Sequence, residues 1–306
     1  MKLGFITAIL DGWTYEEMMD FASEQGFACV EVACWPQEKA ERRYAGVSHI
    51  DAERVNQDDA YAEHIVEYAK KSGVEISALA YYPNVMAADK EKSKAAVEHL
   101  KQVIRASRKL GVGMVTTFIG RDQTKNVQGN LELVKEVWPP IIKLAEECDV
   151  KIAIENCPML FGEEQWPGGQ NLMTTPPIWR EVFRILDSDY LGINYDPSHF
   201  IWQMIDYIRP LYEFKDKIFH VHYKDIKIYR DKLESCGIMA YPLEYMSPKI
   251  PGLGDVDWGK YVSALTDIGY DGCTCIEIED KAFEDSKEKV EKSLILSKRY
   301  LEKYVI

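Results

Sequence analysis

Four acidic or imidazole side chains follow apolar runs at regular places in the second half of the chain. Each stands at or near the end of a short hydrophobic segment, and the four are Glu155, Asp196, His222 and Glu277. Three carboxylates and one imidazole form a hard, mostly oxygen ligand set, which suits Mn²⁺ or Mg²⁺, although Co²⁺ and Zn²⁺ also bind such sets. Burying these acids together without a cation costs several kcal/mol per ion, so the pattern favours a metal site over an ion-pair network.

An alternation of short apolar runs with longer amphipathic runs predicts the elements that carry these residues. Strands are expected at 3–9, 29–34, 75–82, 114–119, 151–155, 191–196, 218–223 and 273–278. Helices are expected at 14–25, 58–72, 90–110, 130–148, 177–186, 210–217, 258–268 and 287–304. The pair Pro139-Pro140 should kink or divide the fourth of these helices.

Eight strand–helix pairs predict an α/β fold, because each parallel crossover requires a helix and eight strands close a barrel. We therefore expect residues 1–306 to form one (β/α)₈ (TIM) barrel domain, with long loops at 156–176 and 226–251, after strands five and seven. A doubly wound open sheet is the alternative. It is disfavoured because no glycine-rich phosphate turn follows the first strand, where Ile9-Leu10-Asp11-Gly12-Trp13 stands.

Further polar and aromatic residues stand near the same strand ends, where the catalytic groups of such barrels lie. His199 follows Asp196 by three residues, and Lys224 follows His222 by two. His220 shares a strand face with His222, although only one of them need be a ligand. The aromatic residues near these ends are Trp35, Tyr81, Tyr82 and Trp166, which either stack on a sugar or pack at the rim. The predicted substrate-binding set is His199, His220, Lys224, Trp35, Tyr81 and Trp166.

Composition excludes several classes of function. The net charge of −13 over 306 residues argues against binding of nucleic acid by a basic surface. No apolar run is long enough to cross a membrane, and the apolar start of the chain ends at Asp11, too early for a signal peptide. Seven cysteines form no paired framework, which is typical of a reducing compartment, so we expect a cytoplasmic protein.

The motifs of the strand ends resemble those of the xylose-isomerase-like superfamily of sugar isomerases and epimerases. The matching features are Glu155, Asp196-x-x-His199, His222-x-Lys224-Asp225, Glu277 and the glycine-rich segment 251–258. The resemblance covers nearly the whole chain. It implies that Glu155, Asp196, His222 and Glu277 bind a divalent metal, most simply Mn²⁺, and that His199 contacts substrate.

The sequence departs from the epimerase pattern at one position. Epimerases of this superfamily use two glutamates on opposite faces of the sugar, and Glu277 matches one of them. The register places Phe161 where the second belongs, with Glu163 or Glu164 as nearby substitutes. Long loops at the catalytic face usually shape a pocket or dock a partner.

These features predict a metal-dependent sugar isomerase or epimerase. Such an enzyme removes a proton next to the carbonyl of a keto-sugar through a metal-bound enediolate, with Glu155, Glu277 and His199 as catalytic residues. The alternative is a lyase of the same barrel that dehydrates an inosose or eliminates from a 3-keto-glycoside. More distant alternatives are an endonuclease IV-like hydrolase, disfavoured by the negative charge, and a non-catalytic sugar-binding barrel. Expected partners are a small sugar or keto-glycoside and a second copy of the chain or a small accessory subunit.

Overall fold

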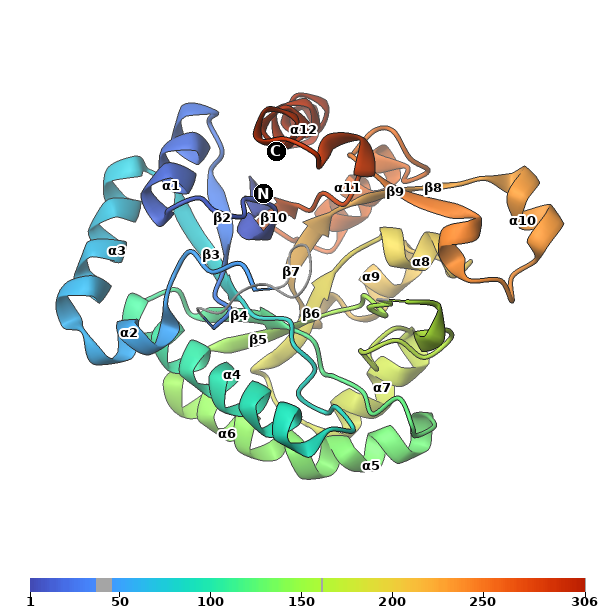
Figure 1. The fold of residues 1–306 in the computed structure, drawn as a ribbon, viewed down its shortest axis with the longest axis horizontal. Helices are drawn as coiled ribbons and strands as arrows, with labels where there is room; N and C mark the ends of the chain where they lie inside the picture. The colour runs from blue at the N-terminus through green and yellow to red at the C-terminus, as the bar shows by residue number, and fades with distance from the viewer. Residues whose placement is uncertain (37–45, 161, 306) are drawn as a thin grey trace.

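Within residues 1–36, 46–160 and 162–305, which the computed structural model describes, eight parallel strands close into a barrel in the order β1-β10-β7-β6-β5-β4-β3-β2 (Figure 1). The strands are β1 (Lys2–Ile6), β2 (Cys29–Ala33), β3 (Glu75–Ala80), β4 (Met114–Thr117), β5 (Lys151–Glu155), β6 (Leu191–Tyr195), β7 (Ile218–Tyr223) and β10 (Cys273–Ile276). The predicted (β/α)₈ barrel is therefore confirmed, and the open doubly wound sheet is excluded.

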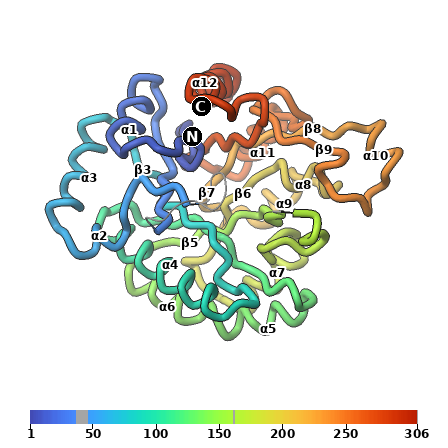
Figure 2. The backbone as a smooth tube through the Cα atoms, in the orientation of Figure 1, coloured from blue at the N-terminus to red at the C-terminus, as the bar shows by residue number. Residues whose placement is uncertain are grey.

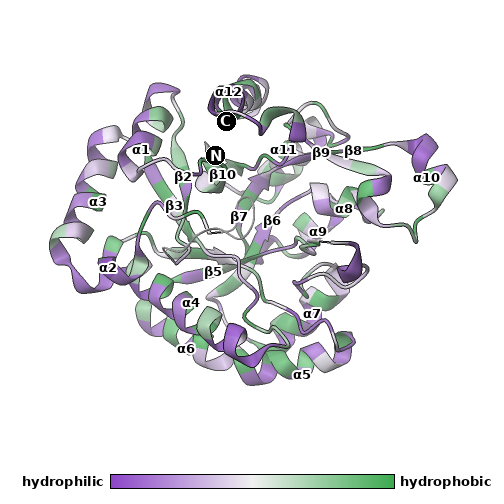
Figure 3. Ribbon diagram, viewed as in Figure 1, coloured by the Kyte–Doolittle hydropathy of each residue, from purple (hydrophilic) through white to green (hydrophobic). Residues whose placement is uncertain are grey.

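Helices surround the barrel, as the tube in Figure 2 shows. They are α1 (Tyr15–Glu24), α2 (Ala52–Gln57), α3 (Asp59–Ser72), α4 (Lys90–Leu110), α5 (Val127–Val137), α6 (Pro139–Cys148), α7 (Pro176–Ile185), α8 (Ser198–Trp202), α9 (Arg209–Glu213), α10 (Arg230–Cys236), α11 (Trp258–Asp267) and α12 (Lys287–Leu301). None of the helices in the described residues is long and apolar enough to cross a membrane. The helices carry both hydrophobic and hydrophilic residues along their length (Figure 3).

Local sequence signals set the helix ends. Thr14 and Glu17 form a complete capping box at the start of α1, and α4 ends at Gly111, which adopts a left-handed conformation with φ of 72°. The helix predicted at 130–148 is divided at Trp138, because Pro139 begins a new helix and cannot continue the old one.

The segment after β7 differs from the predicted loop. It contains β8 (Asp225–Ile228) and β9 (Met246–Lys249), which pair antiparallel, with α10 between them. Figure 1 shows this β8–α10–β9 arm extending from one side of the barrel. The expectation of a loop was wrong because the four-residue strands are too short to show a clear alternation.

Asp225 anchors the base of this arm to the glycine-rich turn. Its carboxylate accepts hydrogen bonds from the backbone N–H groups of Gly252, Gly254 and Val256 at 2.9, 3.2 and 3.1 Å. It also accepts one from the indole N–H of Trp258 at 3.1 Å. Gly254 must be glycine because an added Cβ would overlap the Asp225 carboxylate. One buried acid therefore closes the turn that leads into α11.

A buried histidine joins the end of β1 to the segment after β2. The Thr7 hydroxyl lies 2.9 Å from Nδ1 of His49 and also accepts the Ala33 N–H. Nε2 of His49 then donates to the Leu10 carbonyl at 3.1 Å. In the neutral ring, Nδ1 then accepts the hydrogen of the Thr7 hydroxyl. Burial lowers the pKa of His49 to about 4, against smaller opposing effects of Leu10 and Asp11.

This depressed pKa predicts a loss of stability in acid. Because the unfolded chain binds a proton near pH 6.5 and the folded chain only near pH 4, the contribution of His49 is complete above pH 6.5 and falls as the pH drops to 4. We expect the difference in unfolding free energy between the wild type and His49→Gln to shrink by about 3 kcal/mol over that interval. Urea unfolding of both proteins at several pH values measures this difference in free energy. A difference that stays constant with pH would contradict the low pKa of His49.

Candidate metal centre

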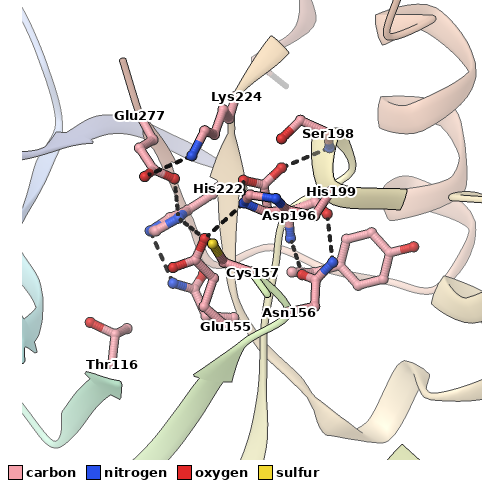
Figure 4. A network of polar contacts seen from close by, with 12 residues as sticks. Thr116, Glu155, Asn156, Cys157, Asp196, Ser198, His199, His222, Lys224 and Glu277 are labelled. Atoms are coloured by element: carbon pink, nitrogen blue, oxygen red, sulfur yellow. Dashed lines mark hydrogen bonds and ion pairs between the residues drawn. The ribbon is translucent and has the colours of Figure 1, made fainter. Parts of the chain in front are cut away.

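Side chains from four strand ends meet at the carboxyl end of the barrel (Figure 4). Glu155 ends β5, Asp196 follows β6, His222 lies in β7 and Glu277 follows β10. One ligand atom from each lies within 4.8 Å of the others. Glu155, Asp196 and His222 are buried, and Glu277 is partly exposed. The barrel thus brings together residues that lie up to 122 positions apart in the chain (277 − 155).

The atoms that face one another in this cluster have no hydrogen-bond partner outside the cluster in the described residues. They are Glu155 Oε1, Asp196 Oδ2, His222 Nδ1 and Glu277 Oε2, and all four are buried. His222 Nδ1 lies 3.0 Å from Glu277 Oε2 and 3.7 Å from Glu155 Oε1. Unpartnered buried polar atoms are rare and costly in native proteins. A divalent cation among the four atoms would partner all of them, so the residues present fit a metal.

Other atoms of the same side chains are held from outside the cluster. Asp196 Oδ1 accepts the Ser198 N–H at 2.7 Å, and Asn156 makes reciprocal hydrogen bonds with the backbone of Asp196 at 2.7 and 2.8 Å. Lys224 Nζ lies 3.1 Å from Glu277 Oε1 and 3.1 Å from Glu279 Oε2. Asp196 and Glu277 therefore each present one constrained oxygen to the centre.

His222 is oriented by a buried carboxylate that sequence reasoning missed. Nε2 of His222 lies 2.6 Å from Glu31 Oε2, while the other oxygen of Glu31 accepts hydrogen bonds from Tyr82 and Thr116 at 2.6 Å each. A histidine that donates one ring N–H to a carboxylate keeps its other nitrogen available for a metal. The signal for Glu31 was a single charged residue inside the apolar strand β2.

The charges of the cluster demand positive charge at its centre. Burial lowers the pKa of His222, yet Glu31, Glu155 and Glu277 raise it well above its ordinary value. Burial raises the pKa of Asp196 to about 6 despite the opposing charges of His199 and Lys224. Burial would also raise the pKa of Glu31, but His222 and other neighbours lower it to about 2. Protons and a lysine thus compensate the acids, and a metal would displace such protons on binding.

His199 faces the same cluster from the first turn of α8. Its Nε2 is buried and without a hydrogen-bond partner in the described chain, 3.3 Å from Asp196 Oδ2 and 3.6 Å from Glu155 Oε1. The indole N–H of Trp202 donates to its other nitrogen at 3.4 Å. With Nδ1 accepting this hydrogen bond, neutral His199 directs its Nε2–H toward the acids of the proposed metal centre.

The polar atoms of His220 and Lys224 are already bound to other side chains of the protein. Both nitrogens of His220 are used inside the barrel, by Ser77 at 3.1 Å and by Asn194 at 3.0 Å. This placement argues against the predicted substrate contact of His220. Lys224 is 2% exposed, and its ammonium group is paired with the two glutamates already described.

The predicted aromatic residues are divided between two sides of the barrel wall. The Tyr81 ring packs 4.6 Å from His99 of α4, outside the barrel, whereas the Tyr82 hydroxyl reaches Glu31. The two neighbouring tyrosines therefore face different groups, and the predicted substrate contact of Tyr81 stays a prediction. Trp35 lies 6.1 Å from the Tyr82 ring, and its predicted role stays a prediction.

The loop after β5 carries the remaining predicted residues. Trp166 lies 6.2 Å from the Trp202 ring and donates to the Met239 carbonyl at 3.0 Å, which links this loop to the β8–α10–β9 arm. Glu163 and Glu164 are exposed in a short 3₁₀ turn. Phe161, expected at the position of a second glutamate, lies outside the described residues.

Solved structures share this fold. The chain aligns over its full length with an IOLI protein that binds a zinc atom, with a TM-score of 0.74, 19% identity and coverage of 98% of that chain. It also aligns over its full length with D-psicose 3-epimerase from Clostridium cellulolyticum H10, with a TM-score of 0.70, 16% identity and coverage of 99% of that chain.

Sequence comparisons identify the family. The chain is 24% identical to the uncharacterized protein YfiH of Bacillus subtilis, over 92% of this chain and 93% of that one. It is 27% identical to an inosose dehydratase of Lactiplantibacillus plantarum, over 39% of this chain and 40% of that one. The model of the xylose isomerase-like TIM barrel family matches residues 19–300. With this match across nearly the whole barrel, the chain belongs to the xylose isomerase-like TIM barrel family.

Proposed function

We propose that this protein is a divalent-metal-dependent sugar isomerase or epimerase, which removes a proton from the carbon next to a carbonyl. The observation that carries the proposal is the convergence of four buried, unpartnered ligand atoms at the catalytic end of the barrel. Glu155, Asp196, His222 and Glu277 would hold the metal. The oxygen-rich set favours Mn²⁺, while the zinc of the IOLI neighbour is in keeping with a broader choice of divalent ion.

When bound, such a cation polarises a substrate carbonyl and offsets the negative charge that develops as the proton leaves. The chain supplies the bases. Glu277 is the most exposed of the four proposed ligands, and Lys224 orients its Oε1, so we assign the first proton transfer to it. His199 Nε2 is placed to bind a substrate oxygen.

Glu155 is the second acid–base group in this proposal. It ends β5, which is separated from β10 by β6 and β7 around the barrel, so it approaches a bound sugar from a different side than Glu277. Return of the proton to the same carbon from that side inverts the carbon, which is epimerisation. Return to the neighbouring carbon is isomerisation. The epimerase among the structural neighbours is in keeping with the first outcome.

A lyase is the second candidate. The matching inosose dehydratase supports it, as does the exposure of both Glu163 and Glu164, since neither is buried beside the cluster as a second epimerase glutamate would be. In a lyase the same deprotonation is followed by loss of a group from the next carbon. An endonuclease IV-like hydrolase has little support, because the cluster offers a single imidazole ligand and the chain carries a charge of −13.

The proposal extends to the location and the partners of the enzyme. All seven cysteines are free, which suits a reducing compartment, and we propose a cytoplasmic location. The partners we propose are a small sugar or keto-glycoside and a second copy of the chain or a small accessory subunit.

Proton abstraction is tested directly by deuterium exchange. Metal-loaded protein is incubated in D₂O with keto-sugars, inososes and 3-keto-glycosides, and deuterium at the carbon beside the carbonyl is followed by NMR. We expect exchange that stops on chelation and falls by about 100-fold or more in Glu277→Gln, which keeps the shape of the side chain but removes the base.

The exposed Glu24 in α1 provides the matched control, since Glu24→Gln should exchange at the wild-type rate. The product separates epimerase, isomerase and lyase. Absence of exchange with every substrate, in protein carrying its full metal content, would refute the proposed chemistry.

Metal affinity tests the role of Glu31. Replacing Glu31 by Gln keeps its volume but removes the charge that orients His222, so we expect the Mn²⁺ dissociation constant from calorimetry to rise about 10- to 100-fold. Glu75→Gln, in the exposed start of β3, is the control and should bind Mn²⁺ normally. Equal affinities in Glu31→Gln and the wild type would show that Glu31 does not support a metal.

A further inference from the structure

A second group of ligand atoms lies beside the proposed metal position. Glu155, Cys157 and His199 are all buried, and one ligand atom from each lies within 4.8 Å of the others. We propose that these three residues bind a second, softer divalent ion such as Zn²⁺ or Co²⁺, with Glu155 shared between the two ions. The proposed function uses neither Cys157 nor a second ion.

Two of the three ligand atoms contact only groups of the proposed metal centre in the described structure. Nε2 of His199 and Oε1 of Glu155 lie 3.6 Å apart, and neither has a hydrogen-bond partner among the described residues. The side chain of His199 is 9% exposed and that of Glu155 is 4% exposed. Burying two such atoms side by side is unfavourable unless something binds between them.

The backbone presents the Cys157 sulfur to this pair. The N–H of Met159, a residue with φ of 55°, donates to Cys157 Sγ at 3.3 Å. The side-chain amide of Asn171 donates to the carbonyls of both Glu155 and Cys157, at 2.8 and 2.7 Å, which fixes the two residues relative to each other. Figure 4 shows Cys157 next to Glu155, and its sulfur lies within 4.8 Å of ligand atoms of both Glu155 and His199. The Met159 N–H and the Asn171 amide therefore hold the Cys157 side chain and backbone in place beside Glu155.

The ligand types of Glu155, Cys157 and His199 favour a different ion from the one expected at the first site. One thiolate, one imidazole and one carboxylate are ligands that zinc accepts, with the fourth position left to water. Mn²⁺ and Mg²⁺ prefer oxygen ligands and would leave this group empty. On binding, the Cys157 thiol releases its proton to solvent, and His199 binds through the Nε2 lone pair of the tautomer that carries its hydrogen on Nδ1, which gives up the contact with the Trp202 indole N–H. A carboxylate that bridges two ions is common in two-metal sites.

A second ion would also affect turnover, and this consequence rests on the proposed function. His199 cannot bind a substrate oxygen while its Nε2 is bound to zinc. Excess Zn²⁺ should therefore inhibit the Mn²⁺-loaded enzyme, and Cys157→Ser should lose this inhibition while retaining exchange activity.

Cobalt spectroscopy tests the site without reference to activity. Metal-free protein carrying Cys236→Ser, which removes an exposed thiol, is titrated with Co²⁺. We expect the first equivalent to bind without a sulfur-to-cobalt charge-transfer band in the near ultraviolet, and the second equivalent to produce that band. Adding Cys157→Ser should abolish the band and the second binding event while leaving the first.

Cys157→Ala provides a second variant, and the urea midpoint of each variant checks that it folds. Three results would overturn the proposal: no band in the parent protein, a band that survives both substitutions of Cys157, or a band that is complete after one equivalent with no further binding. A cobalt–thiolate band in a protein that never exchanges deuterium would support this site and refute the proposed function. Deuterium exchange in a protein that shows no cobalt–thiolate band would support the proposed function and refute the second metal site.

Discussion

Mutual repulsion of carboxylates buried around one point is the constraint on which the carboxyl end of this barrel depends. Glu155, Asp196 and Glu277 cannot all be charged in a medium of low dielectric constant without a compensating positive charge. The ammonium group of Lys224 supplies part of that charge through Glu277. His222 supplies another part, since its pKa is raised by the acids around it. A divalent ion is the compensation that also satisfies the four orphaned ligand atoms.

Strand register makes this cluster possible. Glu155 lies opposite Asn194 in the β5–β6 pair, and Cys275 lies opposite His222 in the β7–β10 pair. The Asn194 side chain reaches toward the next strand, where its amide lies 2.9 Å from His222 Nε2, close to Glu31. A layer of hydrogen-bonded polar groups inside the barrel therefore supports the ligand layer above it. A shift of one residue in any of these strands would turn its ligand toward the helices.

The barrel and its four principal acidic and imidazole residues could be predicted because both follow from local patterns. Apolar runs mark the strands, and a barrel necessarily gathers the ends of those runs. Glu31 could not be assigned in the same way, since its partners lie far away in the chain: Tyr82 after β3, Thr116 in β4 and His222 in β7. The choice between Tyr81 and Tyr82 depended on the exact register of β3. The β8–α10–β9 arm is held by Asp225 through backbone contacts that no periodicity reveals.

Anomalous diffraction from crystals of the Mn²⁺-loaded protein tests the central claim most directly. The account predicts a manganese peak in the anomalous difference map, within coordination distance of Glu155, Asp196, His222 and Glu277. It also predicts loss of that peak in Asp196→Asn crystals soaked in the same way. A map from fully loaded protein with no peak between these four residues, or with the manganese bound elsewhere, would contradict the account.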